Sequence, residues 1–224
     1  MWRQRPTNHE NDDSLHVRTL YAKYDKTQIN TLPRVLFEGR IVVILSEGEA
    51  RRAVDYLLRF PRVGIDTETR PSFKPGGMLP VALLQVSTPD TCFLFRLNRF
   101  GLPQSIVRLL TSTLTQKIGL SLNDDWSQLR RRADFQPANV LELQTYVKRL
   151  GIEDMSLQKL YANIFGQRIS KTQQLSNWEA DVLSEAQKRY AATDAWACLQ
   201  LYHEINRLLT TRDYKFIPST QESL

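Results

Sequence analysis

The chain has 224 residues, of which 42% are hydrophobic and 24% are charged, and its formal net charge is +6. These values allow one sizeable hydrophobic core, exclude bulk disorder, and are permissive for contact with a polyanion such as a nucleic acid. Its two cysteines, Cys92 and Cys198, have no Cys or His at metal-ligand spacing, which argues against a disulfide framework or a structural zinc site and fits a cytoplasmic location.

The first half of the chain predicts a tail followed by a strand-rich region. Residues 1–24 are polar and mixed in charge, and we expect them to form a flexible tail. Arg40–Leu45 is a β-branched run that predicts a strand, and apolar residues at helical spacing predict a helix directly after it. Three more strands, separated by turns with an exposed Gly76-Gly77 pair in one of them, form a predicted antiparallel meander. Their ranges are 63–66, 81–86 and 92–95.

The second half alternates and then becomes helical. A helix, a strand and a helix follow one another from Ile106 to Ala133, and this alternation predicts parallel strands added to the meander. The rest of the chain predicts three helices, over 143–150, 157–165 and 184–209. The last begins with a Ser184-x-x-Gln187 capping box. We therefore expect one α/β domain over residues 25–210, followed by a C-terminal tail over 211–224.

Two carboxylates, Asp66 and Glu68, lie at the end of a predicted apolar strand. In extended backbone, residues two apart project to the same side, so these two can share one ion. Alone the pattern is weak, because acidic residues after strands are most often solvated turn formers.

Two other acidic positions gain meaning only together with this pair. Asp124 and Asp125 stand at the start of a predicted helix, where capping alone explains one aspartate but hardly both. Tyr190 and Asp194 are four residues apart on the long helix, so phenol and carboxylate share one face. An arbitrary Tyr-x-x-x-Asp is usually a packed tyrosine and an exposed aspartate.

In their order along the chain, these residues resemble the DEDDy class of 3′-5′ exonucleases, the group that contains RNase D, the proofreading domains of family A DNA polymerases and Werner-type exonuclease domains. The resemblance covers about Phe37 to Leu208 and implies an RNase H-like (DnaQ-like) α/β fold, with a mixed central sheet flanked by helices. Motif I is Asp66-Thr-Glu68, motif II is Gly119–Leu129 with Asp125 at its acidic position, and motif III is Tyr190-Ala-Ala-Thr-Asp194. The helical connector is matched by Leu141–Tyr146, Ser156–Leu160 and Leu175–Trp178.

The resemblance implies a metal-dependent phosphodiester hydrolase that releases nucleoside 5′-monophosphates from the 3′ end of DNA or RNA. Its cofactors would be two divalent cations, Mg²⁺ or Mn²⁺, which suit hard oxygen ligands. Asp66 would bridge both ions, Glu68 and Asp194 would complete the first, and Asp125 would hold the second largely through water. Tyr190 would orient the attacking water. Whether Asp124 shares metal binding with Asp125 stays open.

Contacts to the nucleic acid are expected from three residues outside the motifs. Lys171 and Arg130 can approach backbone phosphates, although ordinary solvated charge explains both more simply. Trp178 can stack on a base or pack in the core, with the two roles evenly balanced.

Departures from the family keep two alternatives open. No C-terminal helicase-and-RNase-D module and no polymerase follows the nuclease region, so accessory nucleic-acid contacts must come from elsewhere or be absent. Motif II resembles that of a bacterial and Werner-like subgroup more than that of RNase D, and we expect a stand-alone bacterial member with no obligate protein partner. One alternative is a catalytically silent nucleic-acid-binding module of the same fold, against which the complete motifs argue. The other is a hydrolase of small phosphorylated metabolites or very short oligonucleotides. No apolar run reaches the roughly 20 residues that span a bilayer, so no membrane partner is expected.

Overall fold

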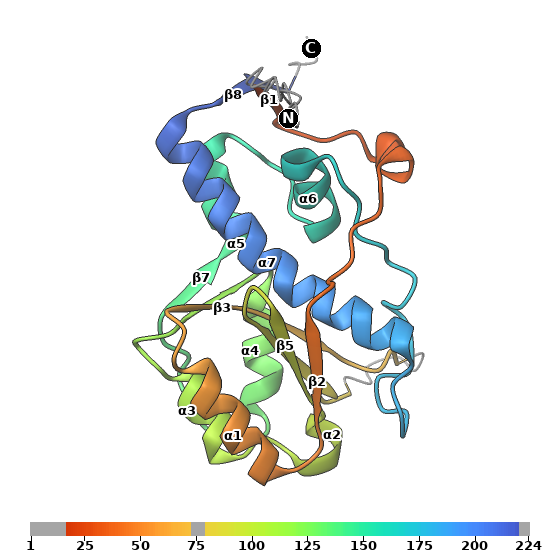
Figure 1. Ribbon diagram of the computed structural model, residues 1–224, viewed down its shortest axis with the longest axis vertical. Coiled ribbons are helices and arrows are strands. Elements are labelled where there is room, and N and C mark those ends of the chain that lie inside the picture. The colour runs from red at the N-terminus through yellow and green to blue at the C-terminus, as the bar shows by residue number, and fades with distance from the viewer. Residues whose placement is uncertain (1–16, 73–78, 220–224) are drawn as a thin grey trace, which may run out of the picture.

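A computed structural model describes residues 17–72 and 79–219 as a mixed α/β fold. Its main sheet has six strands in the order β2-β5-β4-β3-β6-β7, and a second sheet pairs β1 with β8. Figure 1 shows the main sheet lying between the long helix α7 and a group formed by α1, α3 and α4. This is the mixed central sheet flanked by helices that the sequence predicts.

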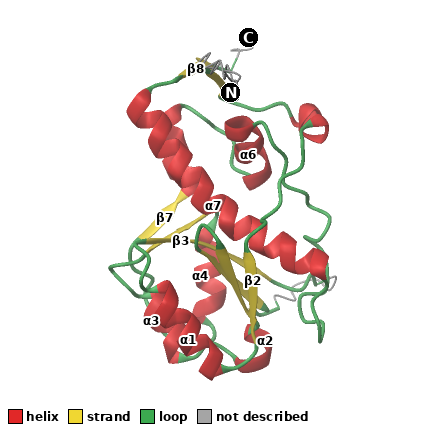
Figure 2. Cartoon of the chain, in the orientation of Figure 1, coloured by secondary structure: helices red, strands yellow, loops and turns green. Residues whose placement is uncertain are grey.

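The elements alternate along the chain much as predicted, and Figure 2 separates their helices from their strands. The strands are β1 (Arg18–Tyr21), β2 (Arg40–Ile44), β3 (Arg62–Glu68), β4 (Leu83–Ser87), β5 (Thr91–Phe95), β6 (Gln116–Gly119), β7 (Val140–Glu142) and β8 (Tyr214–Ile217). The α-helices are α1 (Glu47–Leu57), α2 (Leu97–Phe100), α3 (Gln104–Leu110), α4 (Leu122–Arg130), α5 (Leu143–Tyr146), α6 (Leu157–Phe165) and α7 (Glu185–Thr211). Two 3₁₀ helices are η1 (Lys26–Thr31) and η2 (Val147–Leu150).

Strands β3, β4 and β5 form the predicted antiparallel meander. Strands β6 and β7 extend it with parallel pairing from β3, and β2 pairs in parallel with β5 at the opposite edge. Sequence reasoning missed β7, which is only three residues long, and treated 143–150 as one helix where the structure has α5 and η2. A three-residue strand is too short to carry a readable alternation.

Side chains alternate across the sheet and fill cores on both of its faces. One core lies between the sheet and helices α1, α3 and α4, and it includes Val63 and Ile65 of β3. The other face of the sheet packs under α7, where small residues such as Ala191 and Ala195 allow a close approach. The odd and even residues of β3 therefore belong to different environments.

Helix α7 is the element that carries the second half of the site. It begins with the predicted capping box. The Ser184 hydroxyl oxygen accepts a hydrogen bond from the backbone N–H of Gln187, and the side-chain oxygen of Gln187 accepts one from the backbone N–H of Ser184. Its buried stripe includes Tyr190, Asp194 and Cys198. The two cysteines of the chain, Cys92 and Cys198, are buried and unpaired.

The predicted tails need correction where the structure describes them. Arg18–Tyr21 pairs in parallel with Tyr214–Ile217, so both segments belong to the folded body. The β1–β8 pairing supplies backbone hydrogen bonds that a flexible tail would make with water. Leu20 of β1 is fully buried in the core formed with residues of α6 and α7. The rest of the expected N-terminal tail up to residue 16, and the Gly76-Gly77 turn, lie outside the described residues. Within the described ranges, no helix is long and apolar enough to cross a bilayer.

Candidate active site

The site is built on the C-terminal end of strand β3. Asp66 and Glu68 project from the face of the sheet that α7 covers, while Thr67 between them projects to the face that α4 covers. Asp66 sits beside Gln85 of β4 in the antiparallel register, and Glu68 sits beside Leu83. Strand geometry alone therefore brings the two carboxylates of motif I to one side.

A glycine on β3 lets α7 bring the third carboxylate to the same place. Gly64 lies two residues before Asp66 on the same face, and a Cβ built on it would stand 1.9 Å from the carbonyl oxygen of Ala195. Only a residue without a side chain permits this helix-to-strand approach. Asp194, the neighbour of Ala195, is thereby held over β3.

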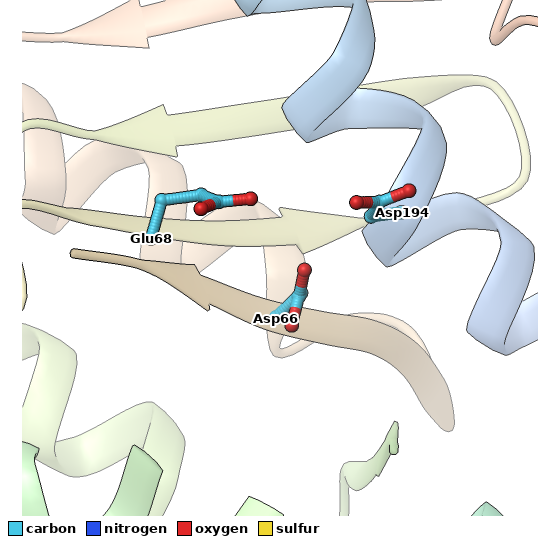
Figure 3. Close-up of side chains that lie close together, drawn as sticks. All are labelled: Asp66, Glu68 and Asp194. Atoms are coloured by element: carbon cyan, nitrogen blue, oxygen red, sulfur yellow. The ribbon is translucent and has the colours of Figure 1, made fainter. Parts of the chain in front are cut away.

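The carboxylates of Asp66, Glu68 and Asp194 form an acidic cluster. Each offers one oxygen atom, and these three oxygens all lie within 4.8 Å of one another. Figure 3 shows the side chains of Asp66 and Glu68 turned towards Asp194 on α7. At about 4 Å, two like charges repel by roughly 4 kcal/mol at an effective dielectric of 20, so the cluster is unstable in its fully ionised form without a counter-charge.

Burial is the main cause that shifts the pKa values of the three carboxyl groups. Burial, followed by repulsion from neighbouring carboxylates, raises the pKa values of Asp66 and Glu68 well above their ordinary range. Burial also raises the pKa of Asp194 to about 7, although the Tyr190 hydroxyl and the charge of Lys171 oppose the rise. Burial therefore disfavours the ionised form of all three groups in a metal-free protein.

These features fit a divalent cation. The donors are carboxylate oxygens, which Mg²⁺ and Mn²⁺ prefer. The Oδ1 atom of Asp194 is buried without a hydrogen-bond partner in the part of the chain that the structure describes. A buried anionic oxygen without a partner is costly, and a bound cation would satisfy it.

Tyr190 stands one turn before Asp194 and lines the same cleft. Its side chain is 9% exposed, and its ring packs against that of Trp178 at a centroid distance of 5.9 Å. Burial, with repulsion from Asp194 and Glu68, raises the pKa of the Tyr190 hydroxyl. The group is therefore a neutral phenol that can donate a hydrogen bond.

Asp125 reaches the site from the other face of β3. It is half-buried in the first turn of α4, and its carboxylate accepts a hydrogen bond from the Thr67 hydroxyl. Burial raises the pKa of Asp125 to about 6, with the Thr67 bond acting against the rise. Asp124 is exposed, so the structure separates the two aspartates and places Asp125 against the strand of motif I. Asp125 is adjacent to the acidic cluster without being one of its three members.

Glu142 holds the beginning of α4 in place. Its carboxylate accepts from the backbone N–H groups of Ser121 and Leu122, each at 2.9 Å, and so caps the helix from the neighbouring strand. Ser121 adopts a left-handed conformation, with φ of 62°, where β6 turns into α4. Capping by a residue distant in sequence frees Asp125 from the capping role considered above.

A cleft of about 340 Å³ opens over the acidic cluster. One wall is β3 and α7, and the other comes from the segments around α6, including Ser156, Gln158 and Ser170. Lys171 lines this cleft and is exposed, so its ammonium group is available to an anionic ligand. A larger hollow of about 550 Å³ lies beside α1 and α3, and it is lined by none of the clustered carboxylates.

Two of the predicted nucleic-acid contacts do not reach this cleft. Trp178 is fully buried beside Tyr190, so its indole has no free face for a base, and of the two roles that the sequence left balanced the structure favours core packing. Arg130 is exposed at the end of α4, outside the lining of the cleft, where its guanidinium contacts Gln136 at 3.5 Å.

Sequence reasoning missed Gly64, Thr67 and Glu142, which position the carboxylates. A glycine inside an apolar strand, two residues before the acidic motif, is a readable signal of close backbone approach. Thr67 stands inside the motif, where alternation places it on the opposite face. Glu142 carries no such signal, because its partners lie about 20 residues away in sequence.

Known proteins resemble this chain over most of its length. Residues 41–210 match the family model described as 3′-5′ exonuclease. The mouse bifunctional 3′-5′ exonuclease/ATP-dependent helicase WRN is 31% identical over 209 residues, which cover 87% of this chain and 15% of that protein. A 3′-5′ exonuclease of Arabidopsis thaliana is 27% identical over 214 residues, covering 87% of this chain and 74% of that protein.

Solved structures share the fold. The EXO domain of Aedes aegypti Nibbler superposes with a TM-score of 0.70 at 22% identity, covering 80% of this chain and 92% of that one. Escherichia coli RNase D superposes with a TM-score of 0.65 at 18% identity, covering 80% of this chain and 52% of that one. The predicted RNase H-like fold is confirmed by these neighbours. With the family match spanning most of the described sheet and α7, the chain belongs to the 3′-5′ exonuclease family.

Proposed function

We propose that this protein is a DEDDy-type 3′-5′ exonuclease that hydrolyses the terminal phosphodiester bond of DNA or RNA and releases nucleoside 5′-monophosphates by a two-metal-ion mechanism. The observation that carries the proposal is the acidic cluster, in which oxygens of Asp66, Glu68 and Asp194 lie within 4.8 Å of one another under a cleft. Membership of the exonuclease family supports the reaction class.

The cations would be held by four carboxylates. Asp66 would contact both, Glu68 and Asp194 would complete the first, and Asp125 would hold the second through water. Bound there, Mg²⁺ or Mn²⁺ would neutralise phosphate charge and lower the pKa of the attacking water. The raised pKa values of Asp66 and Glu68 support this assignment, because carboxylates that are buried and close together ionise readily only beside a counter-charge.

The other residues of the cleft orient the substrate and the water. Tyr190, kept as a neutral phenol by burial, would donate to or accept from the attacking water and set its direction. Glu68 would also contact the terminal 3′ hydroxyl, which favours an end over an internal bond. Lys171 would contact a substrate phosphate at the mouth of the cleft. Arg130 would contact phosphates farther along the nucleic-acid strand.

The test is cleavage of 3′- and 5′-labelled DNA and RNA oligonucleotides of graded length, from dinucleotides upward, with Mg²⁺, Mn²⁺ or EDTA. We expect metal-dependent shortening from the 3′ end. Removing a ligand in Asp66→Ala should lower the rate by more than about 100-fold, since loss of an outer-shell partner alone costs roughly 10–100-fold.

Asp124 offers a matched control for Asp125. Asp125→Ala should lose most activity, whereas Asp124→Ala, which removes an exposed carboxylate one residue away, should retain it. Substrates that stay intact but bound would instead support a silent binding module of the same fold. Cleavage confined to di- and trinucleotides would support the hydrolase of very short oligonucleotides.

A further inference from the structure

Gln85, on β4, is a polar side chain that the acidic cluster does not use. It is 0% exposed, and neither its amide nitrogen nor its amide oxygen has a hydrogen-bond partner in the described chain. Burying an amide without partners is unfavourable, and most buried polar side chains are satisfied. A glutamine in this position therefore points to a partner that joins it when the site is loaded.

The register of the sheet places Gln85 directly beside Asp66. The two residues are partners across the antiparallel β3–β4 pair, so their side chains share one face with Cβ atoms about 4.5–5.5 Å apart. On the other side, the cross-strand partner of Gln85 is Leu94, and its neighbour two positions earlier on the strand is Leu83. Both leucines belong to the apolar cluster packed under α7. Among these neighbours, Asp66 is the one that can accept a hydrogen bond.

We propose that Gln85 is a positioning residue for Asp66: in the metal-loaded site its amide nitrogen donates a hydrogen bond to the Asp66 carboxylate, directly or through one buried water, and holds that carboxylate in the orientation that binds the cations. This inference rests on the proposed function, because it assigns Asp66 as a ligand. Carboxylates that bind metals are themselves hydrogen-bonded by outer residues, and these residues set ligand orientation.

The chemistry of an amide suits this position. An amide donates without bringing a charge, so it does not compete with a cation for the carboxylate, as a lysine or arginine would. A glutamate would add a fourth acidic group to a cluster whose charges already repel. The side-chain amide of Gln85 also offers an acceptor, because its carbonyl oxygen can accept a hydrogen bond from a buried water that bridges to Asp66.

The experiment compares Gln85→Met with wild type in the full chain. Methionine keeps the length of the side chain and removes both polar atoms. Mn²⁺ binding to metal-free protein is measured by calorimetry, and thermal unfolding is measured in EDTA. We expect Mn²⁺ affinity to fall by roughly 10–100-fold, with a melting temperature in EDTA equal to or above that of wild type, because an unpaired amide has been removed.

Leu94→Met is the matched control, since it changes packing on the other side of Gln85 and leaves the amide in place. It should bind Mn²⁺ as wild type does. If Gln85→Met does not fold, Gln85→Leu, which matches the neighbouring leucines, replaces it. A folded Gln85 variant with wild-type Mn²⁺ affinity overturns the inference.

The outcomes also separate this inference from the proposed function. The proposed function is contradicted if the wild-type protein does not cleave the oligonucleotides and Asp66→Ala binds Mn²⁺ as tightly as wild type. A wild-type protein that cleaves, binds Mn²⁺ through Asp66, and is unaffected by Gln85→Met contradicts only the role of Gln85.

Discussion

Gly64 of β3 lies directly under the carbonyl oxygen of Ala195 of α7, where a Cβ would stand 1.9 Å from that oxygen. This contact sets the separation between the strand that carries Asp66 and the helix that carries Asp194. The distance within the acidic cluster therefore depends on a backbone contact that involves none of its members.

Gly64→Ala should push α7 away from β3. Because the obstructing atom is backbone, relief requires the whole helix to move, and such overpacking costs about 1–3 kcal/mol or more. We expect a lower melting temperature together with loss of Mn²⁺ binding. Thermal unfolding and Mn²⁺ calorimetry measure these effects. Gly48→Ala is the control, since a Cβ there meets only a side-chain tip at 3.9 Å, and equal effects from both substitutions would contradict the role given to Gly64.

Asp194→Asn should stabilise the metal-free protein and abolish its response to metal. The folded-state pKa of Asp194, about 7, lies above that of an unfolded aspartate, so the folded state binds more protons between about pH 4 and 7. The stability of wild type is therefore lost as pH rises through this window, and the full cost is present above it.

In EDTA at pH 8, we expect the melting temperature of Asp194→Asn to exceed that of wild type by at least about 2–4 °C, the shift that roughly 1 kcal/mol produces in a domain of this size. The difference should shrink towards pH 4. Added Mn²⁺ should raise the melting temperature of wild type only. A variant less stable than wild type at pH 8 would contradict the burial-raised pKa of Asp194.

Glu142→Ala should disturb Asp125 through the start of α4. The carboxylate caps the backbone N–H groups of Ser121 and Leu122, and losing a cap costs on the order of 1 kcal/mol. We expect a modest fall in melting temperature and a larger fall in the single-turnover cleavage rate, because Asp125 loses its fixed position. Glu142→Gln keeps one acceptor oxygen, so its melting temperature and cleavage rate should lie between those of wild type and Glu142→Ala. Full activity in Glu142→Ala would show that Asp125 is placed by Thr67 alone.

Lys117 should make stability rise with pH above neutrality. Its side chain is fully buried, its ammonium nitrogen donates to the carbonyls of Ser112 and Thr115, and burial lowers its pKa to about 8. Between about pH 8 and the ordinary lysine value, the folded state loses its proton before the unfolded state does, so unfolding becomes harder as pH rises. The neutral amine can still donate to both carbonyls.

Denaturant unfolding from pH 7.5 to 10 tests this relationship. The unfolding free energy of wild type should rise relative to that of Lys117→Met, by up to about 3 kcal/mol for a shift of this size. Parallel curves for the two proteins would contradict a buried, titrating Lys117.

The sequence by itself determined the fold class, the order of most elements and the residues of the motifs. Local patterns carry that information: apolar runs separated by turn residues predicted the meander, and helical spacing with a capping box predicted α7. Asp66, Glu68 and Asp194 stood at the ends or on the stripes of those elements. These signals depend on neighbours in sequence, so they survive without a structure.

Only the tertiary structure decided how those residues meet. The pairing of Arg18–Tyr21 with Tyr214–Ile217, the burial of Trp178, the capping of α4 by Glu142 and the unpartnered amide of Gln85 beside Asp66 all join segments far apart in the chain. Contacts of this kind arise from register and packing across the sheet, and the residues on either side of them in sequence carry no trace of the partner.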